Sequence, residues 1–341
     1  MNIMLASSAS SFSAREEIHW TRAISKKLSD EGHQVDQFTL PIVQDPLLLT
    51  EQLMAFRLLS IDPGCDFLIT IGYPAFTLNH PRKRVLLFSL ASPLHEWFDT
   101  EYGVLATPQY HTLRNSIQAA EKNSLAEANC IVCGSARLAA LLKDEYKLKP
   151  SFYILDDTVE DESGNDLPEQ DLRVITESTL EPCDRYDLLL EAVARSSGKW
   201  KLALFVPSAS AVYYNALLRR IEQLAIQERI AVIKTPLSTT ALEKSLFYLS
   251  LRYQSTRIPE SIIQAIKSSI PIITLSDSGA LLEVVRNNVN GLVLKPDAKN
   301  IAQSLDQACL DATFREKLSK GNQNFVNKLV DVEKVVRELI G

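Results

Sequence analysis

The sequence predicts an α/β protein of two domains, each with a parallel sheet covered by helices on both faces. Three observations lead to this prediction. Apolar runs with the length of buried strands alternate with longer amphipathic segments in the first half of the 341 residues. The same alternation starts again in the second half. Between the halves, residues 156–171 contain eight acidic residues and no basic one, which marks a composition break.

Each element of the first half has a local signal. Gly32 lies just past the last turn of an amphipathic segment, as helix C-termini prefer, and Pro63-Gly64 forms a turn before the next apolar run. The expected strands are residues 2–6, 34–40, 67–71, 84–88 and 130–133, and the expected helices are 16–31, 48–59, 112–127 and 136–145. Strands joined through helices pair in parallel, so this half is expected to form one covered sheet.

The second half repeats this order. Its expected strands are residues 173–176, 201–206, 230–234, 247–251 and 270–275, with one more after Asn290-Gly291, and its expected helices are 186–195, 211–226, 240–244, 261–269, 280–287, 301–310, 312–322 and 324–340. We therefore expect Rossmann-like domains at residues 1–155 and 173–322 that face a cleft, with ligands at the carboxyl ends of the strands. Residues 156–172 are expected to form an acidic linker, or alternatively a partner-binding segment, and residues 323–341 a C-terminal helix that crosses back to the first domain.

Composition argues against several classes of protein. A net charge of −6 opposes non-specific binding of nucleic acid, which needs a basic surface. No apolar run approaches the roughly 20 residues that span a bilayer, and the first residues lack the features of a signal peptide. We expect a cytoplasmic protein, or one at the inner face of the membrane with at most peripheral contact through the basic residues 80–84. The five cysteines lack the spacing of a metal site, so we expect reduced thiols and no metal.

Several stretches resemble one enzyme family. From Pro259 the chain reads PESIIQAIKSSIPIITLSDSGALLEVVRNNVNGLVLKP, and near the N-terminus EIHW precedes ISKKLSDEGHQVDQFTLP. Both resemble family-4 glycosyltransferases, which are retaining enzymes of the two-Rossmann GT-B architecture, with E-A-M-A-x-G-x-P-V and G-H-x-V-x-x-F-T-L-P at these places. HEWFDTEYG is similar to a subgroup found in surface-polysaccharide gene sets. The resemblance covers nearly the whole chain and implies the GT-B fold, a nucleotide sugar as ligand, and no metal or other cofactor.

The resemblance also points to donor-binding positions. In that family an Arg and a Lys neutralise the donor diphosphate, and two Glu residues contact the sugar and the ribose. This chain has Thr179 and Asp184 at the positions of the two cations, with Arg185 beside them. It has Thr256 and Gln264 at the positions of the two Glu residues. Asp in place of Lys reverses the local charge and repels a diphosphate. The donor-side candidates are Thr179, Asp184, Arg185, Thr256, Arg257, Glu260, Gln264 and Glu283.

Two further sets complete the candidates. Arg257 and Glu260 either bind the donor in place of the family's residues or form an ordinary exposed ion pair. On the acceptor side, the family's Gly-Gly loop falls on residues 14–15, and its His-Gln-x-Arg motif falls on residues 89–92. The chain is poor in glycine, with 11 residues, although glycines let a backbone approach a pyrophosphate closely. The acceptor-side candidates are Ser11, Arg15, Glu17 and Ser89.

These departures leave three functions open. The first is a weakly active or non-catalytic homologue that serves as subunit or scaffold for an active glycosyltransferase, or for a second copy of itself, in surface polysaccharide biosynthesis. It predicts a sizeable apolar surface patch. The second is an active retaining glycosyltransferase that transfers a hexose from a nucleotide sugar held by a relocated set of residues. A sugar- or nucleotide-sensing module without turnover is a third option.

Overall fold

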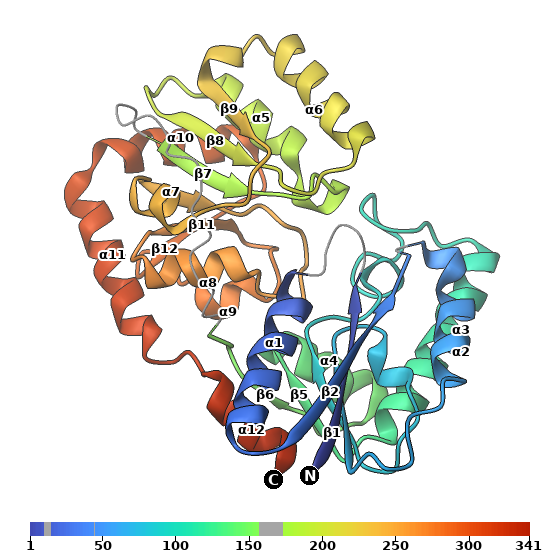
Figure 1. Ribbon diagram of the computed structural model, residues 1–341. Helices are drawn as coiled ribbons and strands as arrows, with labels where there is room; N and C mark the ends of the chain where they lie inside the picture. Colours follow the sequence, from blue (N-terminus) through green and yellow to red (C-terminus); the bar gives the residue numbers. More distant parts are fainter. Residues whose placement is uncertain (10–14, 44, 157–172) are drawn as a thin grey trace. The chain divides into compact units, whose positions relative to one another are not determined.

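The computed structural model describes residues 1–9, 15–43, 45–156 and 173–341 (Figure 1). These residues form two compact units. Unit 1 contains the chain up to residue 156 together with Thr256–Ile258 and Leu329–Gly341, and unit 2 contains the remaining described residues. Each unit has a six-stranded sheet in which every pairing is parallel. The predicted α/β class with two parallel sheets is confirmed.

Unit 1 has the strand order β2-β1-β3-β4-β5-β6. Its strands are β1 (Asn2–Ala9), β2 (Gln34–Pro41), β3 (Phe67–Ile71), β4 (Lys83–Leu87), β5 (Cys130–Cys133) and β6 (Ser151–Phe152). Its helices are α1 (Arg15–Asp30), α2 (Leu49–Arg57), α3 (Pro108–Ala126), α4 (Ala136–Tyr146) and α12 (Val332–Ile340), with 3-10 turns η1 (Pro46–Leu48), η2 (Ala75–Thr77) and η3 (Ser92–Leu94). Because β2 and β3 lie on opposite sides of β1, the winding of the chain reverses between β1 and β3.

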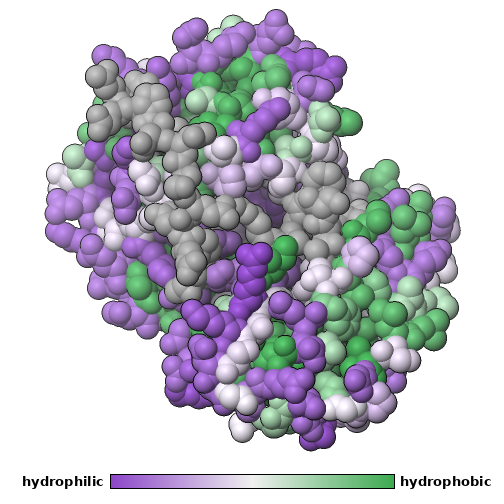
Figure 2. Space-filling model, in the orientation of Figure 1, coloured by the Kyte–Doolittle hydropathy of each residue, from purple (hydrophilic) through white to green (hydrophobic). Residues whose placement is uncertain are grey.

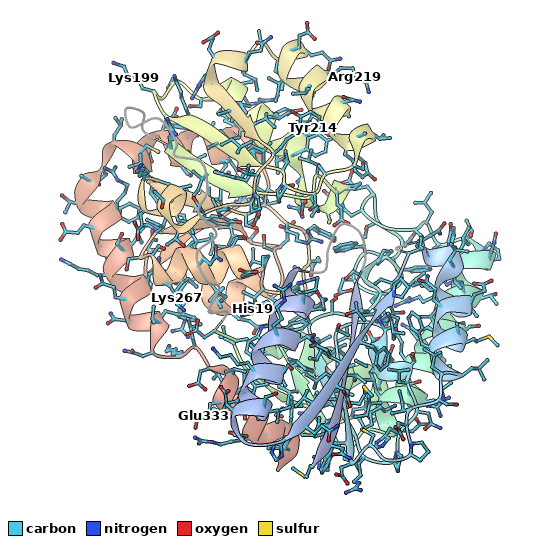
Figure 3. All side chains as sticks on the ribbon, in the orientation of Figure 1. His19, Lys199, Tyr214, Arg219, Lys267 and Glu333 are labelled. Atoms are coloured by element: carbon cyan, nitrogen blue, oxygen red, sulfur yellow. The ribbon has the colours of Figure 1, made fainter. Side chains whose placement is uncertain are left out.

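Apolar side chains cover both faces of this sheet. On one face Trp20 and Ile24 of α1 and Val335 and Leu339 of α12 are buried in a single cluster with strand residues. The other face carries a second buried cluster that includes Leu138 of α4. Glu333, labelled in Figure 3, reaches from α12 to within 3.9 Å of the Lys27 Nζ on α1. The C-terminal helix therefore packs on the first unit, as predicted.

Unit 2 has the strand order β12-β11-β10-β7-β8-β9. Its strands are β7 (Arg173–Glu177), β8 (Lys201–Phe205), β9 (Ile230–Ile233), β10 (Phe247–Leu249), β11 (Ile272–Leu275) and β12 (Gly291–Leu294). Its helices are α5 (Tyr186–Arg195), α6 (Ala211–Gln223), α7 (Thr239–Glu243), α8 (Glu260–Lys267), α9 (Leu281–Val284), α10 (Ala298–Leu310) and α11 (Ala312–Val326), with 3-10 turns η4 (Pro182–Asp184) and η5 (Gln227–Arg229). Counted from its first strand, this is the doubly wound order of dinucleotide-binding folds, whose winding reverses between β7 and β10.

Several elements differ from the expected ones. The expected helix 280–287 is only Leu281–Val284 in the structure, and the short strand β6 was not expected. The end of the chain differs most. The sequence predicts a single helix over residues 324–340, but α11 continues to Val326 and α12 begins at Val332. Between them Val330 forms a parallel bridge with Leu155, and its N–H donates to the Ile154 carbonyl at 2.9 Å. Asp331 then caps α12 by accepting from the Lys334 N–H at 3.0 Å. A long-range strand contact therefore interrupts a continuous helical pattern.

The expectations about the acidic segment, membrane spans and metals can be compared with the described residues only. The predicted acidic segment at residues 156–172 lies almost entirely outside the described residues. No helix in the described part of the chain is both long and apolar enough to cross a bilayer. Within the same residues, no cluster of three or more His, Cys, Asp or Glu side chains has the arrangement of a metal site.

Candidate functional site

Open parallel sheets bind ligands at the carboxyl ends of their strands, where the winding of the chain reverses. In unit 2 that place lies after β7 and β10, which pair with each other. In unit 1 it lies after β1 and β3. The candidate residues are therefore taken unit by unit.

Asp184 ends the turn η4 that follows β7, and it accepts four hydrogen bonds. Its Oδ2 accepts from the Ser178 hydroxyl at 2.8 Å, the Thr179 N–H at 3.2 Å and the Thr179 hydroxyl at 3.1 Å. Its Oδ1 accepts from Arg252 Nη1 at 2.7 Å. Thr179 and Asp184, where the resemblance predicts the two cations, thus bind each other, and an arginine holds the carboxylate of Asp184.

Arg252 is the residue that sequence reasoning missed. It follows β10, and besides Asp184 it contacts Glu181 Oε2 at 3.1 Å. Its side chain is only 26% exposed. A signal existed in the sequence, because Arg252 comes directly after the apolar run 247–251, at the carboxyl end of a predicted strand. Only the pairing of β10 with β7 shows that it meets Asp184.

Arg185, the other cation at this place, is also bound within unit 2. It donates to both carboxylate oxygens of Asp277, at 3.0 and 2.8 Å, and its guanidinium lies 4.7 Å from the centre of the Tyr253 ring. Its side chain is 5% exposed. A bidentate pair stacked on an aromatic ring fixes the guanidinium plane. Arg185 therefore ties the turn after β7 to the turn after β11.

The charges at the winding reversal of unit 2 are unfavourable for an anion. Two guanidinium groups, of Arg185 and Arg252, face three carboxylates, of Glu181, Asp184 and Asp277. Each guanidinium is already in an ion pair. The local balance is negative, whereas a diphosphate needs a surplus of positive charge or of backbone N–H donors.

The candidates on α8 and α9 are held by local contacts. Gln264 Nε2 donates to Glu260 Oε1 at 2.8 Å, one helical turn away, so the amide and the carboxylate stay together. Glu283 is half-buried in the first turn of α9. Asn290 accepts from the N–H of residue 286 and donates to the carbonyl of residue 284, each at 2.7 Å, which closes the turn after α9. A Cβ on Gly291 would lie 2.1 Å from the Ile272 carbonyl oxygen. The family-like Asn-Gly pair thus serves the fold.

In unit 1, Glu17 and Arg257 come together. Glu17 lies in the first turns of α1, and its Oε2 is 3.3 Å from Arg257 Nη2. The Arg257 guanidinium also lies 5.9 Å from the centre of the Phe88 ring. Gly72, directly after β3, has a φ of +80°, and a Cβ there would be 2.5 Å from Glu17 Cγ. A residue expected on the donor side and one expected on the acceptor side therefore form one pair at the winding reversal of unit 1.

Thr256 is buried beside Glu96, which the sequence did not single out. The Thr256 carbonyl accepts from the Ser135 hydroxyl at 2.5 Å. The Thr256 hydroxyl and both Glu96 carboxyl oxygens are buried, and none makes a hydrogen bond of normal geometry within the described residues. Burial raises the pKa of the Glu96 carboxyl, and the nearby Thr256 hydroxyl, His95 and Arg137 oppose this only partly. Buried polar atoms without partners thus lie at the position where the resemblance predicts a contact with the sugar.

His95, next to Glu96, belongs to a buried network. Its Nε2 is 2.8 Å from Glu121 Oε2, which also accepts from the Tyr146 hydroxyl at 2.5 Å. Burial is the largest single influence and would lower the pKa of His95, but the carboxylates of Glu121, Glu96 and Glu145 together outweigh it and the pKa is raised. These contacts join the residue after η3 to α3 and α4, although His95 Nδ1 and Glu121 Oε1 are buried without a hydrogen-bond partner among the described residues.

The remaining acceptor-side candidates add little. Ser11 lies outside the described residues, and the side chain of Arg15, which begins α1, is likewise not described. Ser89 is half-buried in the loop after β4.

Comparison with solved structures shows the fold. Sucrose-phosphate synthase from Thermosynechococcus elongatus has a TM-score of 0.74 at 15% identity, over 98% of this chain and 96% of that one. WaaG, a glycosyltransferase involved in lipopolysaccharide biosynthesis, has a TM-score of 0.70 at 13% identity, over 99% of this chain and all of that one. Alr3699/HepE of Anabaena, solved with UDP, has a TM-score of 0.68 at 13% identity, over 100% and 98%. These likenesses show the GT-B architecture.

Sequence comparison adds the family. No curated protein sequence matches the chain. The model of the family described as "Glycosyl transferases group 1" matches residues 157–325. This segment includes β7 to β12 and the Asp184–Arg252 pair. This segment, just under half of the chain, belongs to the family of glycosyl transferases group 1.

Proposed function

We propose that this protein takes part in glycan assembly as a glycosyltransferase homologue with little or no transfer activity of its own. It would act as a subunit or scaffold beside an active glycosyltransferase. Membership of the family and the likeness to WaaG, an enzyme of lipopolysaccharide biosynthesis, support the setting. The observation that carries the loss of activity is the pairing of Arg252 with Asp184 and Glu181 at the winding reversal of unit 2.

The carboxylate of Asp184 opposes the binding of a diphosphate after β7. Two like unit charges about 4 Å apart repel by about 4 kcal/mol at the effective dielectric constant of a protein surface, before salt screening. A diphosphate placed after β7 would meet the carboxylate of Asp184 where the family supplies a Lys. Arg252 could turn to the phosphate only by leaving Asp184, a side chain just 10% exposed, without its cation. Breaking such a buried pair costs about 3–5 kcal/mol, which would offset most of the free energy that Arg252 gains by binding the phosphate.

A second candidate function has its own observation. Burying a hydrogen-bonding group without a partner costs about 1–3 kcal/mol, and Thr256 and Glu96 bury three such atoms side by side. Sugar hydroxyls would satisfy these atoms, with Arg257 and Glu17 nearby as a charged pair. This favours an active retaining hexosyltransferase in which Glu96, in place of residue 256, contacts the sugar.

Calorimetric titration with UDP, GDP and their glucose, galactose, mannose and N-acetylhexosamine forms tests the proposal. We expect flat traces from protein that circular dichroism shows to be folded. Saturable binding at micromolar strength that Arg185→Ala weakens would overturn the proposal. In that case Glu96→Gln should separate the candidates further, because it would weaken binding of the sugar nucleotide but leave that of the free nucleotide unchanged.

A further inference from the structure

The outer face of α2 carries an apolar ridge. Leu47 of η1, Met54 of α2 and Leu58 at the end of α2 are 47%, 61% and 80% exposed. Their spacing of seven and four residues places all three on one side of a helix. Large aliphatic side chains exposed together in a soluble protein mark an interaction surface. Figure 2 shows hydrophobic side chains on the part of unit 1 where Figure 1 places α2 and α3.

A groove runs beside this ridge, between α2 and α3. Its volume is about 690 Å³, within the size range of ligand and docking sites. Thr50 and Leu53 of α2 and Ile117 and Ala120 of α3 contribute to its lining, and Met54 and Leu58 border it. The apolar ridge and the groove thus lie next to each other along α2.

The charges next to the ridge are arranged symmetrically about Met54. Glu51, three residues before Met54, is exposed. Arg57, three residues after it, is 38% exposed and is oriented by a bidentate contact with Glu127 at 2.5 and 2.6 Å. Behind this pair lies buried Lys83, 3.4 Å from Glu127; burial lowers the pKa of Lys83 to about 8, and Glu127 only partly opposes this. Because Glu127 neutralises one of these two cations, the group of Arg57, Lys83 and Glu127 keeps about one positive charge at neutral pH, and Glu51 carries a negative charge on the other side of Met54. The surface is therefore self-complementary when two α2 helices lie antiparallel.

We propose that the occupant of this surface is a second copy of the same chain, docked through antiparallel α2 helices about a twofold axis that passes Met54. In an isologous interface each residue meets the residue at the mirrored position. Met54 then faces its own copy, Leu58 faces Thr50 at the groove, and Glu51 faces Arg57. The pattern disfavours a membrane surface, which attracts an excess of Lys and Arg. This inference is independent of whether the protein transfers sugar.

The expected dimer is a modest one. Stable interfaces bury about 800 Å² on each partner, and we expect one short helix with its groove to bury less than that. We therefore expect an equilibrium between monomer and dimer at micromolar concentrations, and sedimentation velocity over a concentration series will show it. Leu58→Glu should shift the protein to monomer. The matched control is Leu310→Glu, because Leu310 is equally exposed at 81% on α10 of unit 2 and should leave the dimer unchanged.

A cysteine experiment tests the axis itself. Under mild oxidation Met54→Cys should form a covalent dimer, because residue 54 faces its own copy, whereas Leu47→Cys and the parent chain should not. A parent protein that stays monomeric at all concentrations would overturn the proposal, and flotation with anionic vesicles in that case would assign the ridge to a membrane. Equal loss of dimer in Leu58→Glu and Leu310→Glu, or equal cross-linking from residues 47 and 54, would also overturn it.

Discussion

Replacing Asp184 by Asn should improve the binding of UDP. The substitution removes one negative charge from the winding reversal of unit 2 and leaves Arg252 with Glu181 as its carboxylate partner. The repulsion removed has an upper bound of about 4 kcal/mol for charges about 4 Å apart, and salt screening reduces it. A repulsion of about 1.4 kcal/mol left after screening corresponds, once removed, to a tenfold gain in affinity for UDP. We expect UDP heats that are absent in the parent to become measurable in Asp184→Asn at low ionic strength.

The same change has a cost in stability. Asp184 accepts three hydrogen bonds at one oxygen and a charge-assisted one from Arg252 at the other. Asn retains the acceptor oxygen but presents an N–H₂ group to the guanidinium, so one charged bond is lost at about 1.5–3 kcal/mol. A fall of about 3–10 °C in Tm follows.

Asp187→Asn is the matched control for this prediction. Asp187 has a 63% exposed side chain near Arg220 on the outer side of α5 and undergoes the same chemical change. It should leave both Tm and UDP heats at the parental level. Unchanged UDP heats in a folded Asp184→Asn protein, or an equal gain in Asp187→Asn, would refute the electrostatic explanation.

Three further predictions concern stability. Arg185→Ala leaves Asp277 unpaired and should lower the free energy of unfolding by about 3 kcal/mol in urea titrations, whereas Arg185→Lys should retain part of it. Burial raises the pKa of Glu96, so between the unfolded and the folded pKa the folded state binds more protons than the unfolded chain. The free energy of unfolding should therefore fall as the pH rises from the unfolded to the folded pKa. Glu96→Gln should abolish this pH dependence, and an unchanged profile would contradict the prediction. Gly291→Ala should destabilise by more than about 2 kcal/mol, because its Cβ would lie 2.1 Å from the Ile272 carbonyl oxygen, and a smaller loss would show that β11 can yield.

The sequence predicts those elements best whose signals are local. Residues 130–133 and 186–195 have the predicted bounds, because each combines an apolar run or stripe with clear flanking residues. The sequence predicts the final helix less well. The pattern of residues 324–340 is compatible with one helix, and the break at Val330 arises from its bridge to Leu155, a partner far away in the sequence. No periodicity within the segment reports such a contact.

The candidate site shows the same division. The sequence shows that Asp184 stands where a similar family has a cation, but its partner Arg252 is identified only once β10 is known to lie beside β7. The neighbours Glu96 and Thr256 come from distant segments of one unit, and Glu96 has no distinguishing motif around it. Residue identity can therefore show where the charge differs from the family's pattern, whereas the residue that pairs with it becomes visible only in three dimensions.

The return of α12 to unit 1 has a consequence for synthesis on the ribosome. Val335, Val336 and Leu339 are buried in the same cluster as Ile3 and Leu5, so the first strand to emerge waits for the last helix before its core closes. Until then the part of that sheet face that α12 covers stays open, although α1 already packs beside it, while all of unit 2 is made. A nascent chain in this condition exposes apolar surface and is prone to aggregate. Any truncation that removes α12 should therefore yield aggregates instead of a smaller working protein.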